Sequence, residues 1–245
     1  MIIFYGIRPY GKTRACGSSY VVTRFFHIWF VPLFPVGSQL VLEPLPDGNY
    51  RGMDIGLDIK STFAGYARVW GPIAVIAAIA TGIGILDDVD DAASMLVAGG
   101  FTAFVVLALL ALTILSFAVV GTLSNEEKQK RNVYALHTGY HVDPADMGQA
   151  RMSVRERLMA TIHERARGLA SMGYRGPGDP TQAWPHYALD PTHNDDALVT
   201  AAFALARIDA SMGQGPYKSH MDTLHDQLWQ RILRMNPPYL HAPVR

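Results

Sequence analysis

Two long apolar runs stand out in the pattern of hydrophobic and polar residues along the chain. The first extends from Val69 to Leu86 and the second from Met95 to Leu123, and neither contains a charged side chain. A helix needs roughly 20 apolar residues to cross the ~30 Å hydrocarbon core of a bilayer, a length that both runs approach or exceed. Helices that are apolar on every face are uncommon in soluble proteins. The pattern therefore predicts two transmembrane helices that form a hairpin.

The segments on either side of these runs have different patterns. Residues 1–60 are rich in β-branched, aromatic and turn-forming residues, which predicts a small β-hairpin module closed by a turn at Pro46–Asn49. Residues 66–123 hold the transmembrane hairpin, with spans at about 69–86 and 95–123. Residues 124–245 predict a helical bundle with a proline-rich tail. The whole sequence thus predicts an α-rich membrane protein built from three parts.

Apolar positions at helical spacing predict three helices in the C-terminal part, at Arg151–Met172, Asp195–Met212 and Tyr217–Met235. Asn125–Tyr140 is basic and amphipathic, and we interpret it as an extension of the second span. Gly173–Pro191 is rich in proline and glycine and is predicted to be a loop.

The overall composition agrees with a membrane protein. Of 245 residues, 49% are hydrophobic and 17% are charged, and the mean hydropathy is +0.11, whereas soluble domains carry about 25% charged residues. Basic and acidic residues number 21 each, so no bulk charge indicates a nucleic-acid partner. The single cysteine, Cys16, excludes an internal disulfide. No cleavable signal peptide is expected, because the first basic residues follow the short apolar start of the chain.

The charges that flank the two spans predict their orientation. Basic residues lie before the first span and after the second: Arg51, Lys60, Arg68, Lys128, Lys130 and Arg131. The loop between the spans has no basic residue and carries Asp87, Asp88, Asp90 and Asp91. The positive-inside rule therefore places both termini in the cytoplasm. We interpret the acidic loop as a solvated turn rather than a calcium site, because it lacks the ligand spacing of a calcium-binding loop.

Small residues recur at four-residue steps in both spans. Ala74, Ala78 and Gly82 lie on the first, and Gly99 and Ala103 on the second. This spacing lets helix backbones approach closely in lipid, either within the hairpin or against a partner, with Gly82 and Gly99 as candidate partner contacts. Neither span contains an ionisable residue, which argues against a proton relay or ion path formed by this chain alone.

An unusual aromatic segment, FFHIWFVPLFP, occupies residues 25–35. It is too short to cross a bilayer and contains two prolines, so it is a poor helix. We expect it to lie against the membrane surface or a partner. Its candidate contact residues are Phe25, Phe26, Trp29, Phe30 and Phe34.

With the preceding arginine, this segment resembles the zinc-ribbon-type module found at the start of many small bacterial membrane-associated proteins. The resemblance covers about the first 45 residues and rests on Arg24, Phe25, Phe26 and Phe30–Pro35. Zinc-bearing members hold the metal with two Cys-x-x-Cys knuckles, whereas this chain has Cys16 alone. Because structural zinc takes four Cys or His ligands, Cys16 and His27 do not complete a site. The resemblance implies a metal-free relative in a bacterial inner membrane.

Residues 6–13, GIRPYGKT, match the Walker A phosphate-loop pattern. That loop requires a helix directly after it, so that the helix N-terminus faces the phosphates. Here Gly17-Ser-Ser and a β-branched run follow, and sixty residues leave no room for a doubly wound sheet. We therefore expect no nucleotide site.

Histidine and arginine clusters in the C-terminal part are the remaining candidates for chemistry. His186, His193 and Asp195 are weak candidates for a metal or acid–base site, although Asn194 or Asp195 is also expected to cap the following helix. Four arginines cluster on one predicted helix and form a solvated face or a contact for anionic lipid: Arg155, Arg157, Arg165 and Arg167.

These patterns lead to one functional hypothesis and two alternatives. The first is a non-catalytic, membrane-anchored accessory or assembly subunit without a cofactor, which binds other membrane subunits or copies of itself. The second is a membrane-anchored enzyme or metal-binding protein that uses the His186/His193 region. The third, a transporter subunit, requires further copies or partners to form a path.

Overall fold

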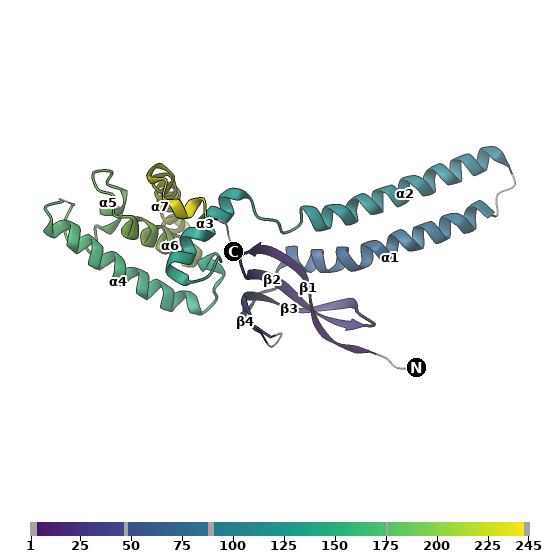
Figure 1. The fold of residues 1–245 in the computed structure, drawn as a ribbon, viewed down its shortest axis with the longest axis horizontal. Helices are drawn as coiled ribbons and strands as arrows, with labels where there is room; N and C mark the ends of the chain where they lie inside the picture. Colours follow the sequence, from purple (N-terminus) through teal and green to yellow (C-terminus); the bar gives the residue numbers. More distant parts are fainter. Residues whose placement is uncertain (1–3, 47–48, 88–90, 175, 243–245) are drawn as a thin grey trace. The chain divides into compact units, whose positions relative to one another are not determined.

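The computed structural model describes residues 4–46, 49–87, 91–174 and 176–242, and its contacts divide the chain into two compact units (Figure 1). The first unit comprises Met1–Ala15, Tyr20–Val41 and Asp54–Thr122, and the second comprises Cys16–Ser19, Leu42–Met53 and Leu123–Arg245. Most of the N-terminal strands therefore belong to the same unit as the two apolar helices, where the sequence predicts separate parts.

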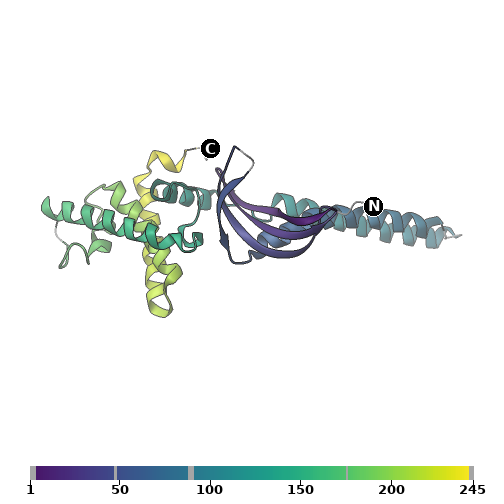
Figure 2. The same cartoon turned by 90° about the horizontal axis from the view of Figure 1, so that it is seen from below.

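The N-terminal segment forms the predicted β module, a four-stranded antiparallel sheet in the order β1-β2-β3-β4 (Figure 2). Its strands are β1 Tyr5–Cys16, β2 Ser19–Ile28, β3 Val31–Pro44 and β4 Tyr50–Ile55. Leu45 N donates to Asn49 O at 2.8 Å at the predicted turn, whose residues Asp47 and Gly48 lie outside the described residues.

Two prolines shape the β2–β3 pair. Proline has no N–H to donate, so it disfavours a regular ladder and is found at edges and bulges. The register shifts once between Arg24 and Phe25 and again between Phe26 and His27, next to the partners Pro35 and Pro32. These bulges interrupt the ladder on β3, and the backbone carbonyls of Pro32 and Leu33 accept hydrogen bonds from side chains of another element, described below.

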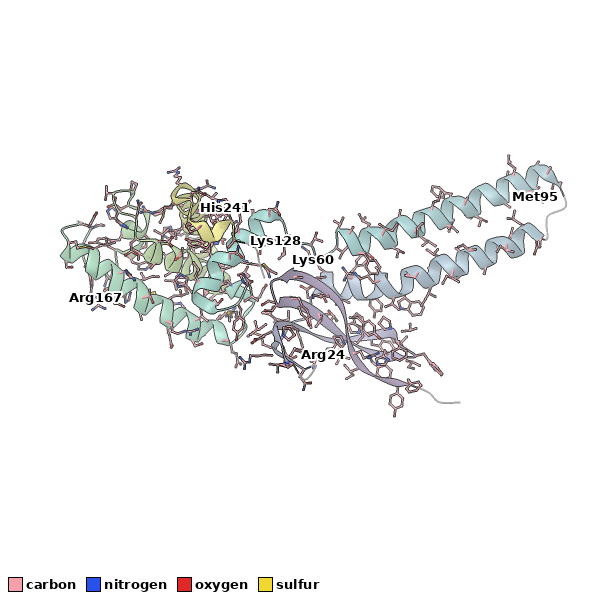
Figure 3. All side chains as sticks on the ribbon, in the orientation of Figure 1. Arg24, Lys60, Met95, Lys128, Arg167 and His241 are labelled. Atoms are coloured by element: carbon pink, nitrogen blue, oxygen red, sulfur yellow. The ribbon has the colours of Figure 1, made fainter. Side chains whose placement is uncertain are left out.

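Helices α1 Ile59–Asp87 and α2 Ala92–Ala118 are both long and apolar enough to cross a membrane. They lie side by side and run in opposite directions, with Lys60 and Met95 near their respective first residues (Figure 3). Asp91 caps α2 through a hydrogen bond from Ser94 N to its carboxylate. The predicted continuation of the second span is wrong, because α2 ends at Ala118 and Ser124 caps a separate helix.

The second unit is helical, as predicted. It contains α3 Asn125–Thr138, α4 Ala150–Ser171, α5 Trp184–Leu189, α6 Asp196–Met212, α7 Gly215–Met235 and short 3₁₀ turns at Pro144–Asp146 and Pro238–Leu240. The three predicted helices correspond to α4, α6 and α7, whereas α5 interrupts the predicted Gly173–Pro191 loop. Every residue from Leu198 to Ala206 is buried, so α6 is the central helix of this unit.

Candidate functional surface

The turn between β2 and β3 is formed by two bulky aromatic residues in a left-handed conformation. Trp29 has a φ of 51° and Phe30 a φ of 67°. Positive φ at both central residues is typical of a type I′ hairpin turn, for which Asn-Gly is the preferred pair. A side chain with a Cβ in this region costs roughly 1–2 kcal/mol. Trp29 and Phe30 are therefore not favoured by the backbone conformation of this turn, which Asn and Gly would adopt with less strain.

The two turn residues form an exposed group of rings with Phe4, which we call the aromatic tip (Phe4, Trp29 and Phe30). The Phe4 ring centroid lies 6.0 Å from that of Trp29 and 6.4 Å from that of Phe30. Their exposed fractions are 52%, 47% and 53%. Arg8 places its guanidinium carbon 5.1 Å from the Phe30 ring centroid, so a cation lies beside the rings.

Two side chains of α1 hold the hairpin that carries the aromatic tip. The Tyr66 hydroxyl donates to Leu33 O at 2.7 Å, and Trp70 Nε1 donates to Pro32 O at 3.0 Å. Both acceptors lie at the proline-associated bulges of β3. Trp70 is also the second residue of the apolar run predicted to enter the membrane. The hairpin is thus fixed to α1 at the level where its long apolar stretch begins.

Phe25 does not belong to this surface, contrary to the prediction that it is a contact residue. It is fully buried, and its ring centroid lies 4.9 Å from that of Tyr66 and 5.8 Å from that of Tyr10. A Cβ at Gly65 would lie 2.7 Å from the Phe25 ring, so the helix glycine makes room for it. Strand alternation explains the difference, because Phe25 faces α1 whereas its neighbour Phe26 is on the opposite face.

Phe26 and Phe34 form a second ring pair on β2 and β3. Their ring centroids lie 6.5 Å apart, and Phe34 is 65% exposed. The pair sits at directly opposed positions of the two strands. Of the five aromatic residues expected to make contact, Trp29, Phe30 and Phe34 are exposed, Phe26 is half-buried and Phe25 is buried.

The GIRPYGKT motif lies entirely within strand β1 and is followed by a turn and β2 rather than by a helix. Gly11 has a φ of 68°, and a Cβ there would lie 1.9 Å from Ser61 O of α1. The Ser61 hydroxyl donates to Gly11 O at 2.7 Å. The second glycine of the motif therefore allows strand and helix backbones to touch, which is a packing role.

Arg68 of α1 joins the sheet to the C-terminal end of α2. Its guanidinium donates to Ser116 O and Val120 O near the end of α2, and to Lys12 O of β1. Helix C-termini leave carbonyl groups without intrahelical partners, and a cation there also complements the helix dipole. Arg68 thus caps α2 while it fixes β1.

Gly82 packs within the α1–α2 pair, because a Cβ there would lie 2.1 Å from the Thr102 side chain. Gly71, about three helical turns before Gly82 on α1, makes the equivalent contact with Thr113 of α2. The side chain of Leu86 would lie 3.7 Å from a Cβ at Gly99. The expectation that Gly82 is available to a partner is therefore wrong: its small size serves the helix pair itself.

His193 is held by backbone groups on both sides of its ring. Its Nε2 lies 2.7 Å from Tyr187 O, and its Nδ1 accepts from Asp195 N at 3.3 Å. A carbonyl partner requires Nε2–H, and an N–H donor requires an unprotonated Nδ1, so this neutral tautomer has no nitrogen left for a metal. Asp195 caps α6 by accepting from Leu198 N, which confirms the predicted cap.

No group of three potential metal-ligating side chains lies together among the described residues. His186 is exposed on α5, and burial raises the pKa of the Cys16 thiol, which opposes the thiolate that a metal requires. The arginines of α4 do not form one free face either. Arg155 forms a bidentate ion pair with Asp209, with Nε–Oδ1 at 2.6 Å, inside the second unit.

Comparison with known proteins adds no relative: no family model, no curated protein and no solved structure matches this chain.

Proposed function

We propose that this chain is a non-catalytic accessory subunit, anchored by α1 and α2 in a bacterial inner membrane, that binds a larger membrane protein complex. The two long apolar helices support membrane association. The basic residues outside the apolar runs and the acidic residues between them favour a cytoplasmic location for both termini. On this proposal the N-terminal module is a metal-free relative of the zinc-ribbon type, kept for binding.

The observation that carries the proposal is the Trp29-Phe30 turn. These residues occupy left-handed positions that favour Asn and Gly, and about half of each side chain is exposed. Neither backbone preference nor burial against the residues that the structure describes accounts for two large rings there. Burial against another molecule does account for them, because tryptophan and other aromatic residues are enriched at the centres of protein interfaces.

The aromatic tip is held in a fixed conformation, which favours a protein partner over lipid alone. A bilayer interface accepts aromatic side chains on a flexible loop, whereas a protein surface rewards rings that are already held in their bound orientation. Here the turn backbone is fixed by Trp29 N donating to Phe4 O at 2.9 Å and by the Tyr10 hydroxyl donating to Phe30 O at 2.8 Å. The Tyr66 and Trp70 hydrogen bonds fix the hairpin to α1.

The test is a double substitution, Trp29→Asn with Phe30→Gly, which supplies the preferred type I′ pair and removes both rings. The free energy of unfolding should change by no more than about 1 kcal/mol, since relief of backbone strain offsets the lost ring contacts. After gentle detergent extraction of a tagged chain, mass spectrometry should find partner subunits with the wild type and lose them with the double variant.

The matched control places the same dipeptide in the turn between β1 and β2, as Gly17→Asn with Ser18→Gly. Gly17 already has a φ of 58°, so the change introduces the same residue types without touching the aromatic tip. This control should retain the partners. Equal recovery of every protein by the wild type and the tip variant would refute the proposal. Extraction of the wild-type chain without any partner would refute it as well. If the double variant no longer binds membranes, the aromatic tip contacts lipid instead.

A further inference from the structure

A polar hollow in the second unit has no part in the proposed membrane contact. Its volume is about 720 Å³, within the range of pockets that bind metabolite-sized ligands. It is open between the segment that follows α5 and the last turns of α7. Its polar wall is formed by Asn194, Gln227, Gln230, Arg231 and Arg234.

Arg231 is buried in the wall of this hollow without enough hydrogen-bond partners. The residue is only 8% exposed, and its Nη2 donates to His193 O at 2.6 Å. Its Nε and Nη1 have no hydrogen-bond partner in the described ranges 4–46, 49–87, 91–174 and 176–242. Buried polar groups are nearly always paired, so a charged group left in this state indicates a missing acceptor.

The wall of the hollow carries two cationic side chains, Arg231 and Arg234. The residues that line the hollow include Arg234 and contain no carboxylate. Asp190 is the acid whose charge acts on Arg231, but its carboxylate accepts hydrogen bonds from Thr192 N at 2.9 Å and Thr192 Oγ1 at 2.7 Å. Within residues 4–46, 49–87, 91–174 and 176–242, no carboxylate therefore accepts a hydrogen bond from the desolvated Arg231 guanidinium.

We propose that this hollow binds a small molecule through a phosphate group held by Arg231 and Arg234. Two guanidinium groups match the charge of a phosphate monoester, which carries about −1.5 to −2 at neutral pH. A phosphate oxygen supplies the acceptor that Arg231 lacks once the guanidinium turns its buried Nε and Nη1 toward the hollow, and charge-assisted bonds of this kind are among the strongest in proteins. The amides of Asn194, Gln227 and Gln230 bind polar groups on the rest of the ligand.

The proposal is tested on the purified full chain in a neutral detergent, with inorganic phosphate as the probe and ionic strength kept constant with chloride. The wild type should show a saturable rise in the midpoint of thermal unfolding. Arg231→Met and Arg234→Gln should weaken the apparent affinity about tenfold or more, because each removes a charge-assisted contact. Arg157→Gln, an exposed arginine of α4 in the same unit, should leave the affinity unchanged.

A second arm distinguishes a soluble phosphate compound from a lipid headgroup. The chain is placed in phosphatidylcholine nanodiscs with or without phosphatidic acid, and the unfolding midpoint is measured without free phosphate. A rise that requires phosphatidic acid and Arg231 identifies a lipid source, whereas a rise with inorganic phosphate alone identifies a soluble one.

The proposal is overturned if neither source raises the unfolding midpoint, or if Arg157→Gln weakens the response as much as the pocket variants. Should Arg231→Met fail to fold, the exposed Arg234 decides the matter, because its substitution does not disturb the core. These outcomes are independent of partner capture through the aromatic tip.

Discussion

Two groups of aromatic rings, one in each unit, have closely similar chemistry and opposite surroundings. In the first unit Phe30 of the aromatic tip stacks on His27, and Arg8 lies over Phe30. In the second unit Tyr134, Trp229 and His225 each stack on the buried Phe203, a group that we call the buried cluster, and Lys130 lies over Trp229. Both groups combine three rings, an imidazole and a cation.

The two groups differ in burial, and this difference determines whether the rings stabilise the fold or are available for binding. Phe203 is completely buried and Trp229 is 3% exposed, so the buried cluster is stabilised by removing its own rings from water. Phe30 is 53% exposed and sits on a strained backbone. Ring stacking alone therefore does not identify a core. A ring group that is exposed and costs backbone energy is better explained as a binding surface.

The largest expected effect comes from removing one ring from each group. Phe203→Ala should lower the free energy of unfolding of the second unit by about 3–5 kcal/mol, because it leaves a cavity in the core. Phe30→Ala should change stability by less than about 1 kcal/mol, because the ring is half exposed. Denaturant unfolding in detergent, with hydrogen exchange to locate the change, measures both. Equal losses would remove the distinction between core and surface.

Acid should weaken the buried cluster through His225. Burial lowers the pKa of His225 to about 4, and its Nε2 lies 2.9 Å from the Tyr134 hydroxyl. Since the folded state favours the neutral ring, this stabilisation is complete above the unfolded pKa near 6.5 and is lost as the pH falls through the folded pKa. The total loss is about 3 kcal/mol.

Hydrogen exchange of α6 and α7 between pH 7 and pH 4 measures this effect, after correction for the intrinsic exchange rate. His225→Phe keeps an aromatic ring beside Phe203 but removes the titration, so its stability should depend less on pH. Burial also lowers the pKa of His137, which leaves a smaller slope of the same sign in the variant. If the stability of His225→Phe depends on pH as steeply as that of the wild type, groups other than His225 cause the acid sensitivity.

The smallest expected difference concerns the two cations. Lys130 Nζ lies 5.4 Å from the Trp229 ring centroid and 2.8 Å from Glu126 Oε1, so Lys130→Gln should cost about 0.5–1 kcal/mol. Arg8 lies over an exposed ring, so Arg8→Gln should cost less than about 0.5 kcal/mol. Unfolding measured at low and high salt tests whether Lys130→Gln costs more stability than Arg8→Gln. A greater loss from Arg8→Gln would show that the tip is stabilised by its cation.

The long periodic or uniformly apolar segments were predictable from sequence because each satisfies a simple local rule. The helices α4, α6 and α7 follow from apolar residues at helical spacing, and α2 and the part of α1 from Val69 onward follow from uninterrupted apolar runs. The end of α2 was not predictable in this way, since Val119 and Val120 are as apolar as the helix before them. Arg68 caps the helix there from a position 48 residues earlier than Ser116.

The candidate surface was only partly predictable, for reasons of strand alternation and tertiary contact. The aromatic composition of residues 25–35 indicated a contact segment, but the two bulges change which side chains share a face. Alternation separates neighbours on one strand, such as Phe25 and Phe26, but not Phe25 of β2 from Phe34 of β3, which face opposite surroundings. Arg231 carried no sequence signal at all, because its unpaired nitrogens depend on a hollow formed by α7 and a segment about 40 residues earlier.

The position of β1 at one end of the strand order has a consequence for solubility. An edge strand exposes unpaired backbone groups that can template the addition of a strand from another molecule. Its sequence opposes this with three cations, Arg8, Lys12 and Arg14, with Pro9, and with irregular backbone at Gly11 and Arg14. Apart from Arg14, these features lie within GIRPYGKT, so the segment that matches a phosphate loop has the composition of a protected strand edge.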